Sequence, residues 1–323
     1  MTLERTPIIC PPRPNRSTEL FGGEASGILN WNDLKHPYFY EWREEIRANF
    51  WIVAEVDMSA AANEFSFVSD QETILNDLAK LTVHNDAQNA LSSAIADYAS
   101  DPAITSIFAT LFDQVMEHNN AFTYALSHIA PDQERQRELL AQAMDPVLQE
   151  RIARTNEAKE AITAEPTEAN ILRGMTQLAL VKGVEMYNTL ISFYRLAEDG
   201  EMKSLAPLIG RVQRDREAQV RFLGELFRVA LSESDVDRDA LKEEMKRWIE
   251  EAVTIEAKDN NTEDAIRFTQ YRANRLLQLM GLPTAYPEVD NPLEWTKAYT
   301  TFDVEQEAST ASDGIDLFGF DDL

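Results

Sequence analysis

Four histidines and 56 carboxylates are the side chains of this chain that could bind a metal ion. The histidines are His36, His84, His118 and His128. A metal pair inside a helical bundle needs about four carboxylates and two histidines, commonly as two Glu-x-x-His pairs on one helix face. No Glu-x-x-His occurs, because Leu81, Val115 and Ala125 precede three histidines by three residues and Asp33 precedes the other. Each histidine taken alone is interpreted as an ordinary structural residue.

Other kinds of site are no better marked in the sequence. Cys10 is the single cysteine, which excludes a disulfide framework and a zinc site built from cysteines. There is no Gly-x-Ser-x-Gly elbow and no glycine-rich phosphate loop. The net charge of −26 repels phosphates, so we expect no nucleic-acid partner.

The elements that must position any site are helices. Glycine is scarce, with 11 residues in 323, and apolar residues recur at spacings of three and four. The pattern predicts an all-α chain, with several helices long enough for a bundle. The expected helices cover 37–49, 70–99, 101–130, 132–162, 166–198, 202–233, 238–258 and 262–280.

Some helix ends are marked by their residue types. Pro102 and Pro166 stand where a first helical turn tolerates proline. Ser232 or Ser234 is the expected start of the helix at 238–258. Gly281 is the expected stop of the last helix.

The chain divides by composition into an irregular arm (1–28), a helical bundle (29–300) and an acidic tail (301–323). No apolar run is long enough to span a membrane, and the N-terminus lacks the apolar core of a signal peptide. We therefore expect a soluble cytoplasmic protein. The tail is either a disordered end or a docking peptide, and docking is favoured by its apolar residues, Leu317, Phe318, Phe320 and Leu323.

Three stretches carry a resemblance to a known family. GILNWNDLKHPYFYEWREEIRANFWIVAEVDMS (27–59) resembles the N-terminal segment of the radical-generating small (beta) subunit of class I ribonucleotide reductase. YRANRLLQLMGLP (271–283) and NPLEW (291–295) are similar to that family's closing helix and the turn after it. The resemblance implies a ferritin-like bundle, a homodimer, and a C-terminal tail that docks on the large catalytic subunit.

The family holds two metal ions with six ligands. By resemblance, the six positions fall on Asn85, Val115, His118, Lys182, Arg216 and Gln219. A shift of one residue moves the first position to His84 or Asp86. With Asn85 as the first position, only His118 is a ligand-type side chain. Because two divalent metal ions need anionic oxygens, we expect no bound transition metal.

Lys182 and Arg216 would place cations where the family binds metal. An unpaired buried cation costs several kcal/mol, so we expect both to pair with carboxylates inside the bundle. The expected partners are Asp86, Asp113 and Glu117.

The family's radical tyrosine falls on Phe122, which is much harder to oxidise. A shift of two residues along the same helix would instead use Glu117, Asn120 and Tyr124. The family passes its radical outward through a tryptophan, an aspartate and a histidine, and Trp51, Asp215 and His118 match all three by resemblance. Structural support of the fold is an alternative role of equal weight for this trio.

Three functions remain open. The first is a metal-free small subunit that supports reduction of ribonucleotides to deoxyribonucleotides through a radical at an unfamiliar residue. The candidate residues are Tyr187, Tyr124, Tyr194 and Trp51. The second is a catalytically silent homologue that binds and regulates the large subunit. The third is another ferritin-like oxidase with relocated metal ligands.

Overall fold

The computed structural model describes residues 1–6, 9–12, 19–287 and 290–299. Over these residues the chain forms eleven α-helices and no strand, which confirms the predicted all-α class. The helices are α1 (Tyr38–Ala48), α2 (Ala61–Ser66), α3 (Gln71–Ala96), α4 (Pro102–Ile129), α5 (Gln133–Gln142), α6 (Pro146–Ala164), α7 (Glu168–Gly183), α8 (Tyr187–Glu198), α9 (Leu205–Glu233), α10 (Arg238–Asp259) and α11 (Glu263–Leu279). Two short 3-10 turns lie at Val53–Glu55 and Glu294–Thr296.

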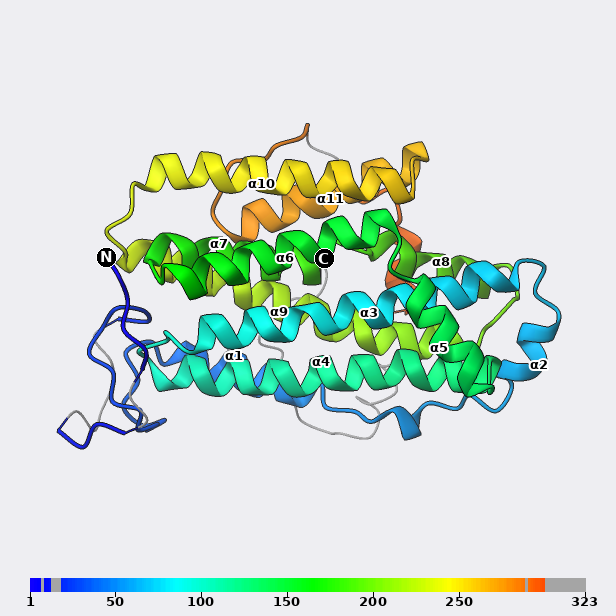
Figure 1. Cartoon of the computed structure of the whole chain (residues 1–323), viewed down its shortest axis with the longest axis horizontal. Helices are drawn as coiled ribbons and strands as arrows, with labels where there is room; N and C mark the ends of the chain where they lie inside the picture. The colour runs from blue at the N-terminus through cyan, green and yellow to red at the C-terminus, as the bar shows by residue number, and fades with distance from the viewer. Residues whose placement is uncertain (7–8, 13–18, 288–289, 300–323) are drawn as a thin grey trace.

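The long helices run along the longest axis of the molecule (Figure 1). Helix α3 packs along α4 and α6, and α7 packs along α9 and α6. Helix α11 lies against α7, α9 and α10, while α1 covers α4 and α9. Four helices, α3, α4, α7 and α9, therefore enclose the interior in which a site could form.

Two helices that the sequence pattern predicts as continuous are each broken. The range 132–162 divides into α5 and α6, because Asp145 caps the second helix with a 2.8 Å bond from the Leu148 amide and Pro146 occupies its first turn. The range 166–198 divides into α7 and α8 at Met186, whose φ is 62°. Such a left-handed residue cannot continue a right-handed helix.

Other expected helix ends have mixed outcomes. Pro102 begins α4 as predicted, and Gly281, with φ 68°, follows α11 as predicted. Two starts were predicted wrongly. Helix α10 is capped by Asp237 and not by a serine, and Pro166 precedes Thr167, the cap of α7. In both cases a side chain closer to the first turn reaches the free amides.

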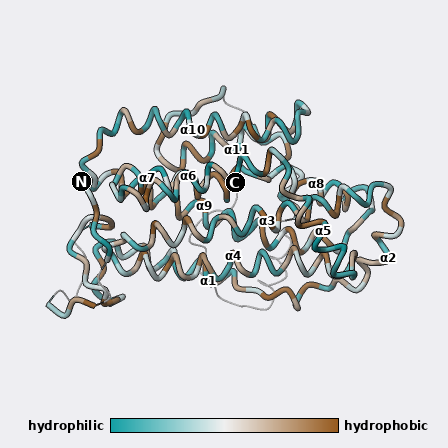
Figure 2. Tube along the Cα trace, in the orientation of Figure 1, coloured by the Kyte–Doolittle hydropathy of each residue, from teal (hydrophilic) through white to brown (hydrophobic). Residues whose placement is uncertain are grey.

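Hydrophobic and hydrophilic residues alternate along the helices, as Figure 2 shows. Their apolar faces form the core, and residues of the arm add to it, with Leu3 and Leu20 buried. The arm is fixed by backbone bonds from Leu3 to Pro166 and from Ser100 to Leu20. No helix in the described part of the chain is both long enough and apolar enough to cross a membrane.

Candidate functional site

The six positions implied by the resemblance come together in the interior. Asn85 lies on α3, Val115 and His118 on α4, Lys182 on α7, and the last two positions on α9. The six side chains are at most 1% exposed, at Asn85, Val115, His118, Lys182, Arg216 and Gln219. Residues far apart in the chain thus form one enclosed polar cluster.

A chain of hydrogen bonds links α7, α9, α4 and α1. The Lys182 ammonium donates to Oε1 of Gln219 over 2.7 Å, and Nε2 of Gln219 donates to Oε1 of Gln114 over 2.7 Å. Gln114 then donates to the carbonyl of Ile46. Close approach of α7 and α9 depends on Gly183, since a Cβ there would meet Val220 at 3.0 Å. Glutamine and lysine therefore connect the helices at this level.

The first expected ligand position, Asn85, is preceded in the chain by another buried polar residue, His84. Asn85 donates to the carbonyl of Val115 over 2.7 Å and accepts from Gln88 over 2.9 Å. His84 is equally buried, but its Nε2 bonds to Glu185 at 2.8 Å. Asp86 lies on the exposed side of α3. An interior site would thus use Asn85 or His84.

The expected carboxylate partners of the two cations were predicted wrongly. Asp86 and Asp113 are exposed, and Glu117 accepts the backbone amide of Val53 instead. The carboxylates whose charges act on the cations are Asp215, near Lys182, and Glu185, near Arg216. Helical periodicity explains the difference, because residues one or two positions from a buried residue turn to the outer face.

Burial dominates the electrostatics of the two cations. The pKa of Lys182 lies well below its ordinary value, because burial disfavours the ammonium and Arg216 adds repulsion. Burial also lowers the pKa of Arg216. Within the described residues, the guanidinium nitrogens of Arg216 have no hydrogen-bond partner. The carboxylates of Asp215 and Glu185 oppose these pKa decreases through their charge.

The chemistry of these six side chains does not fit a pair of divalent metal ions. Two cationic side chains, two amides, one aliphatic side chain and one imidazole stand where four carboxylates and two histidines would be needed. The described residues contain no group of three or more His, Cys, Asp or Glu side chains arranged to hold a metal ion. Cations at Lys182 and Arg216 would repel such ions.

The two possible registers of α4 face opposite sides. Val115, His118 and Phe122 are buried. In the shifted register, Asn120 is exposed and both Glu117 and Tyr124 are half-buried. An interior site that uses α4 therefore takes the first set, in which a phenylalanine occupies the tyrosine position.

Trp51, Asp215 and His118 form a buried hydrogen-bonded trio. The Trp51 indole donates to Oδ2 of Asp215 over 2.9 Å, and Nε2 of His118 lies 2.9 Å from the same oxygen. The two rings are nearly parallel, with centroids 6.5 Å apart. Burial lowers the pKa of His118 despite the carboxylate beside it. The three residues named by the resemblance thus lie together in the structure, and their role in radical transfer stays a prediction.

A small cavity opens beside the trio. Its volume is about 240 Å³, and its lining includes Trp51, Asp215, Gln114, Asp113 and Glu117. Phe50 and Ile52 also line the cavity, and both side chains are exposed. The buried trio thus lies close to solvent at one point.

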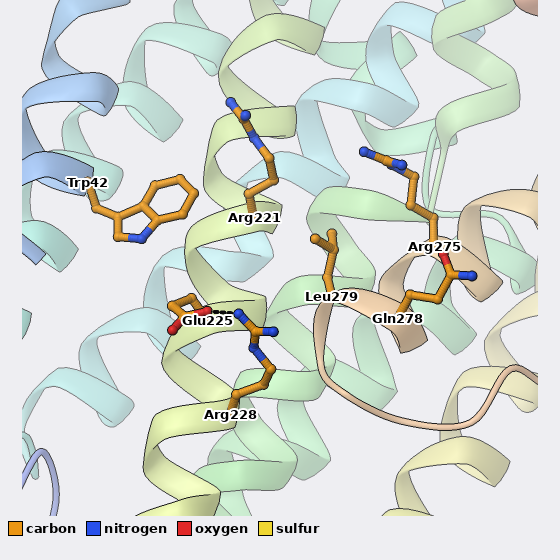
Figure 3. A pocket seen from close by; sticks show the side chains of 7 residues that line it. All are labelled: Trp42, Arg221, Glu225, Arg228, Arg275, Gln278 and Leu279. Atoms are coloured by element: carbon orange, nitrogen blue, oxygen red, sulfur yellow. Dashed lines mark hydrogen bonds and ion pairs between the residues drawn. The ribbon is translucent and has the colours of Figure 1, made fainter. Parts of the chain in front are cut away.

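A second cavity, of about 300 Å³, lies away from the cluster (Figure 3). It is lined from α1, α9 and α11 by Trp42, Arg221, Glu225, Arg228, Arg275, Gln278 and Leu279. Glu225 and Arg228, one turn apart on α9, form an ion pair in its lining, and Arg221 bonds to Glu45. No residue expected to act in a site lines this cavity.

The proposed radical carriers have different surroundings. Tyr187 is 1% exposed, and its hydroxyl donates to Glu217 over 2.9 Å. Tyr194 is buried, bonds to the Gln213 amide and stacks on Tyr299 at 4.6 Å. Tyr124 is half-buried and contacts the ring of His128. These tyrosines thus differ in burial and in their hydrogen-bond acceptors.

Sequence reasoning missed Glu185, Glu217 and Arg272 as parts of the interior. Glu185 accepts from His84 and from Gln177, and Arg272 donates to Glu217 over 2.5 Å. Nothing in the sequence pattern distinguishes Glu185 and Glu217 from the rest of the 56 acidic residues. Glu185 lies inside the unexpected break between α7 and α8, which no residue type announces.

The tail residues expected to dock, Leu317, Phe318, Phe320 and Leu323, lie outside the described residues.

Comparisons with known proteins agree on one family. The family model described as "Ribonucleotide reductase, small chain" matches residues 28–292. The ribonucleoside-diphosphate reductase subunit beta of Halalkalibacterium halodurans is 26% identical over 313 residues, which cover 92% of this chain and 90% of that protein.

Solved structures give the same fold. A protein described as a class I ribonucleotide reductase from Bacillus halodurans aligns with a TM-score of 0.86 and 25% identity, over 91% of this chain and 99% of that one. The ribonucleotide reductase R2 subunit of Clostridium botulinum aligns with a TM-score of 0.86 and 20% identity, over 93% and 99%.

Proposed function

Because the chain belongs to the small-chain family of ribonucleotide reductases, we propose that it is a metal-free small subunit. In this role it supports the radical-based reduction of ribonucleotides to deoxyribonucleotides, together with a large catalytic subunit. The observation that carries the proposal is the pair of buried cations, Lys182 and Arg216, among the four central helices.

The charge balance of the interior supports the metal-free state. The charges of Asp215 and Glu185 act on the two cations, and Lys182 also bonds to Gln219. Two metal ions would add about four positive charges beside the Arg216 guanidinium and the Lys182 amine. Retaining them would require carboxylates that this cluster does not contain.

The trio of Trp51, Asp215 and His118 supports a retained radical-transfer role. Its hydrogen bonds share one carboxylate oxygen, so indole and imidazole are linked through a single acceptor. The neighbouring cavity, which Trp51 lines, supports this role because it brings the trio close to solvent. The trio alone also suits a purely structural function, which activity measurements distinguish.

We further propose that the subunit is a homodimer and that its C-terminal tail contacts the large subunit. The tail combines acidic residues with apolar ones, and the apolar residues give a docking peptide its anchors. Deletion of 317–323 is expected to abolish binding to the large subunit while the fold remains. Sedimentation of the mixed subunits measures both assemblies.

The central test combines three measurements on the full-length protein. Metal analysis of freshly purified protein is expected to find iron and manganese far below stoichiometric amounts. Reductase assays with the cognate large subunit are expected to show turnover that chelators do not remove. Stoichiometric metal, or the absence of turnover under every activation tried, rejects the proposal.

A silent regulatory subunit is the second candidate. It is favoured by Phe122, which occupies the tyrosine position and is completely buried. In that case the protein binds the large subunit and alters the turnover that another small subunit supports, without turnover of its own. A host that encodes an ordinary small subunit as well would favour this function.

A further inference from the structure

Tyr187, Glu217 and Arg272 form a buried group at the junction of α8, α9 and α11. The Tyr187 hydroxyl and Nη1 of Arg272 both donate to Oε1 of Glu217, over 2.9 Å and 2.5 Å. The Arg272 guanidinium lies 3.8 Å from the centre of the Tyr187 ring and also donates to the carbonyl of Gly183. We propose that Tyr187 is the residue oxidised to a radical and that Glu217 accepts its proton. This proposal rests on the proposed function.

Burial makes Tyr187 suitable for storing a radical. Its side chain is 1% exposed, so water and small reductants reach the ring poorly. The pKa of Tyr187 is raised, chiefly by burial, so the phenol carries its proton at neutral pH. Oxidation must therefore remove that proton together with an electron.

Glu217 is placed to receive the proton. Burial alone would raise its pKa, but the charge and hydrogen bond of Arg272 and the hydroxyl of Tyr187 lower it below its ordinary value. The carboxylate is therefore ionised before oxidation. One electron passes from the phenol to a high-potential one-electron oxidant, and the proton moves to Glu217. The products are a neutral phenoxyl radical and a carboxylic acid.

The other tyrosines lack this combination. Tyr194 is buried, but its hydroxyl bonds to an amide oxygen of Gln213, which does not take up a proton at neutral pH. Tyr299 bonds to Glu198 in an exposed position. Among the tyrosine hydrogen bonds found in the described part of the chain, only that of Tyr187 joins full burial to a carboxylate acceptor.

Arg272 shapes the strength of the radical as an oxidant. When Glu217 becomes neutral, the guanidinium loses its ionic partner while it remains buried beside the ring. That loss makes the oxidised state less stable and the radical a stronger oxidant. Such a radical has the driving force to take an electron from a partner group outside the subunit.

Flash photolysis of the full-length protein tests the assignment. Photogenerated ruthenium(III) tris-bipyridine removes one electron, and rapid freezing followed by EPR detects the product. We expect a tyrosyl signal that narrows when tyrosine rings are deuterated. Tyr187→Phe is expected to lose the long-lived part of the signal, since a radical at an exposed tyrosine such as Tyr40 is not protected from reduction, whereas the matched buried control Tyr194→Phe keeps it.

Glu217→Gln tests the proton acceptor separately. Glutamine can still accept the hydroxyl hydrogen bond but cannot take up the proton. The rate of radical formation, and with it the yield, is expected to fall by about a hundredfold or more, in the range of a lost general base. An unchanged yield in this variant contradicts the role of Glu217.

If Tyr187→Phe does not fold, as judged by circular dichroism, difluorotyrosine incorporated at position 187 replaces it. Fluorine hyperfine splitting in the signal then supports the assignment. An unsplit signal, the absence of any radical, or a signal lost only in Tyr194→Phe overturns it.

Reductase assays separate this inference from the proposed function. Full turnover in Tyr187→Phe overturns the inference and leaves the proposed function intact. A radical at Tyr187 in a protein without turnover supports the site assignment and rejects the proposed function. Loss of turnover and of the signal in Tyr187→Phe alone supports both.

Discussion

The ammonium nitrogen of Lys182 on α7 lies 2.7 Å from Oε1 of Gln219 on α9, in the closed interior of the bundle. This single bond connects two of the four central helices. Both partners are buried, so each depends on the other to satisfy its polar atoms. The contact therefore predicts a strong interdependence of the two residues.

Removing both partners should cost less than the sum of the two single losses. Lys182→Met leaves the amide oxygen of Gln219 without its donor, at a cost of about 1–3 kcal/mol in unfolding free energy. Gln219→Leu leaves the Lys182 amine without its acceptor and Oε1 of Gln114 without its donor, at a cost of about 1–3 kcal/mol for each.

The double variant Lys182→Met/Gln219→Leu should recover the part of that loss that comes from the Lys182–Gln219 bond, while the buried Gln114 still lacks its donor. Urea unfolding of all four proteins measures the cycle. Strictly additive losses would show that the bond contributes nothing.

Restoring the expected ligand types should create a metal site. Four carboxylates and a second histidine would supply the charge and donors that two divalent ions require. The variant carries N85D, V115E, K182E, R216E and Q219H. Bound Mn²⁺ should raise its unfolding free energy by about 2.7 kcal/mol at one hundred times the dissociation constant.

Calorimetric titration with Mn²⁺ measures binding directly. The wild type and the single variant Gln219→His serve as controls, and neither should bind stoichiometrically, because Lys182 and Arg216 remain. Tight binding by the wild type would contradict the account given for the interior.

Trp51→Phe should distinguish a role of Trp51 in radical transfer from a purely structural role. The variant loses one indole hydrogen bond to Asp215, at about 1–3 kcal/mol, while His118 keeps its own. Reductase turnover with the large subunit should fall to background if Trp51 carries the radical outward.

Trp248→Phe is the matched control for that experiment. Trp248 is half-buried, and its indole likewise donates to a side chain inside the bundle, Gln177, over 2.7 Å. Its loss should cost similar stability and leave turnover in place. Equal turnover in both variants would assign the trio a structural role alone.

Asp77 should make stability depend on pH. Burial raises the pKa of Asp77 from 3.8 to about 6, although Lys80 and Ser192 act against the rise. Its folded pKa lies above its unfolded value, so its contribution is present below pH 3.8 and is lost as the pH rises through about 6.

Asp77→Asn does not titrate and should remove that part of the pH dependence. Relative to the wild type, the variant should gain about 2 kcal/mol of unfolding free energy between pH 4 and pH 7.5. Urea unfolding at the two pH values gives the difference. If the difference in unfolding free energy between Asp77→Asn and the wild type is the same at both pH values, burial does not raise the pKa of Asp77 in the folded protein.

Periodicity and a few end signals predicted most of the helices, because apolar spacing reflects which side of a helix is buried. The breaks at Asp145 and Met186 escaped prediction for different physical reasons. Asp145 and Pro146 form a local start signal within a continuous helical pattern. Met186 takes a left-handed backbone that its residue type disfavours, and its amide bonds to the distant Glu256.

Residue types and their order along the chain were enough to identify the family and to place Lys182 and Arg216 in the interior. Which anions face those cations was decided only by the folded structure. The carboxylates of Glu185 and Asp215 act there, whereas the nearby Asp86 and Asp113 turn outward. The reason is geometric: one residue along a helix rotates a side chain by about 100°. Contacts between distant helices then select, among 56 acidic residues, the few that enter the core.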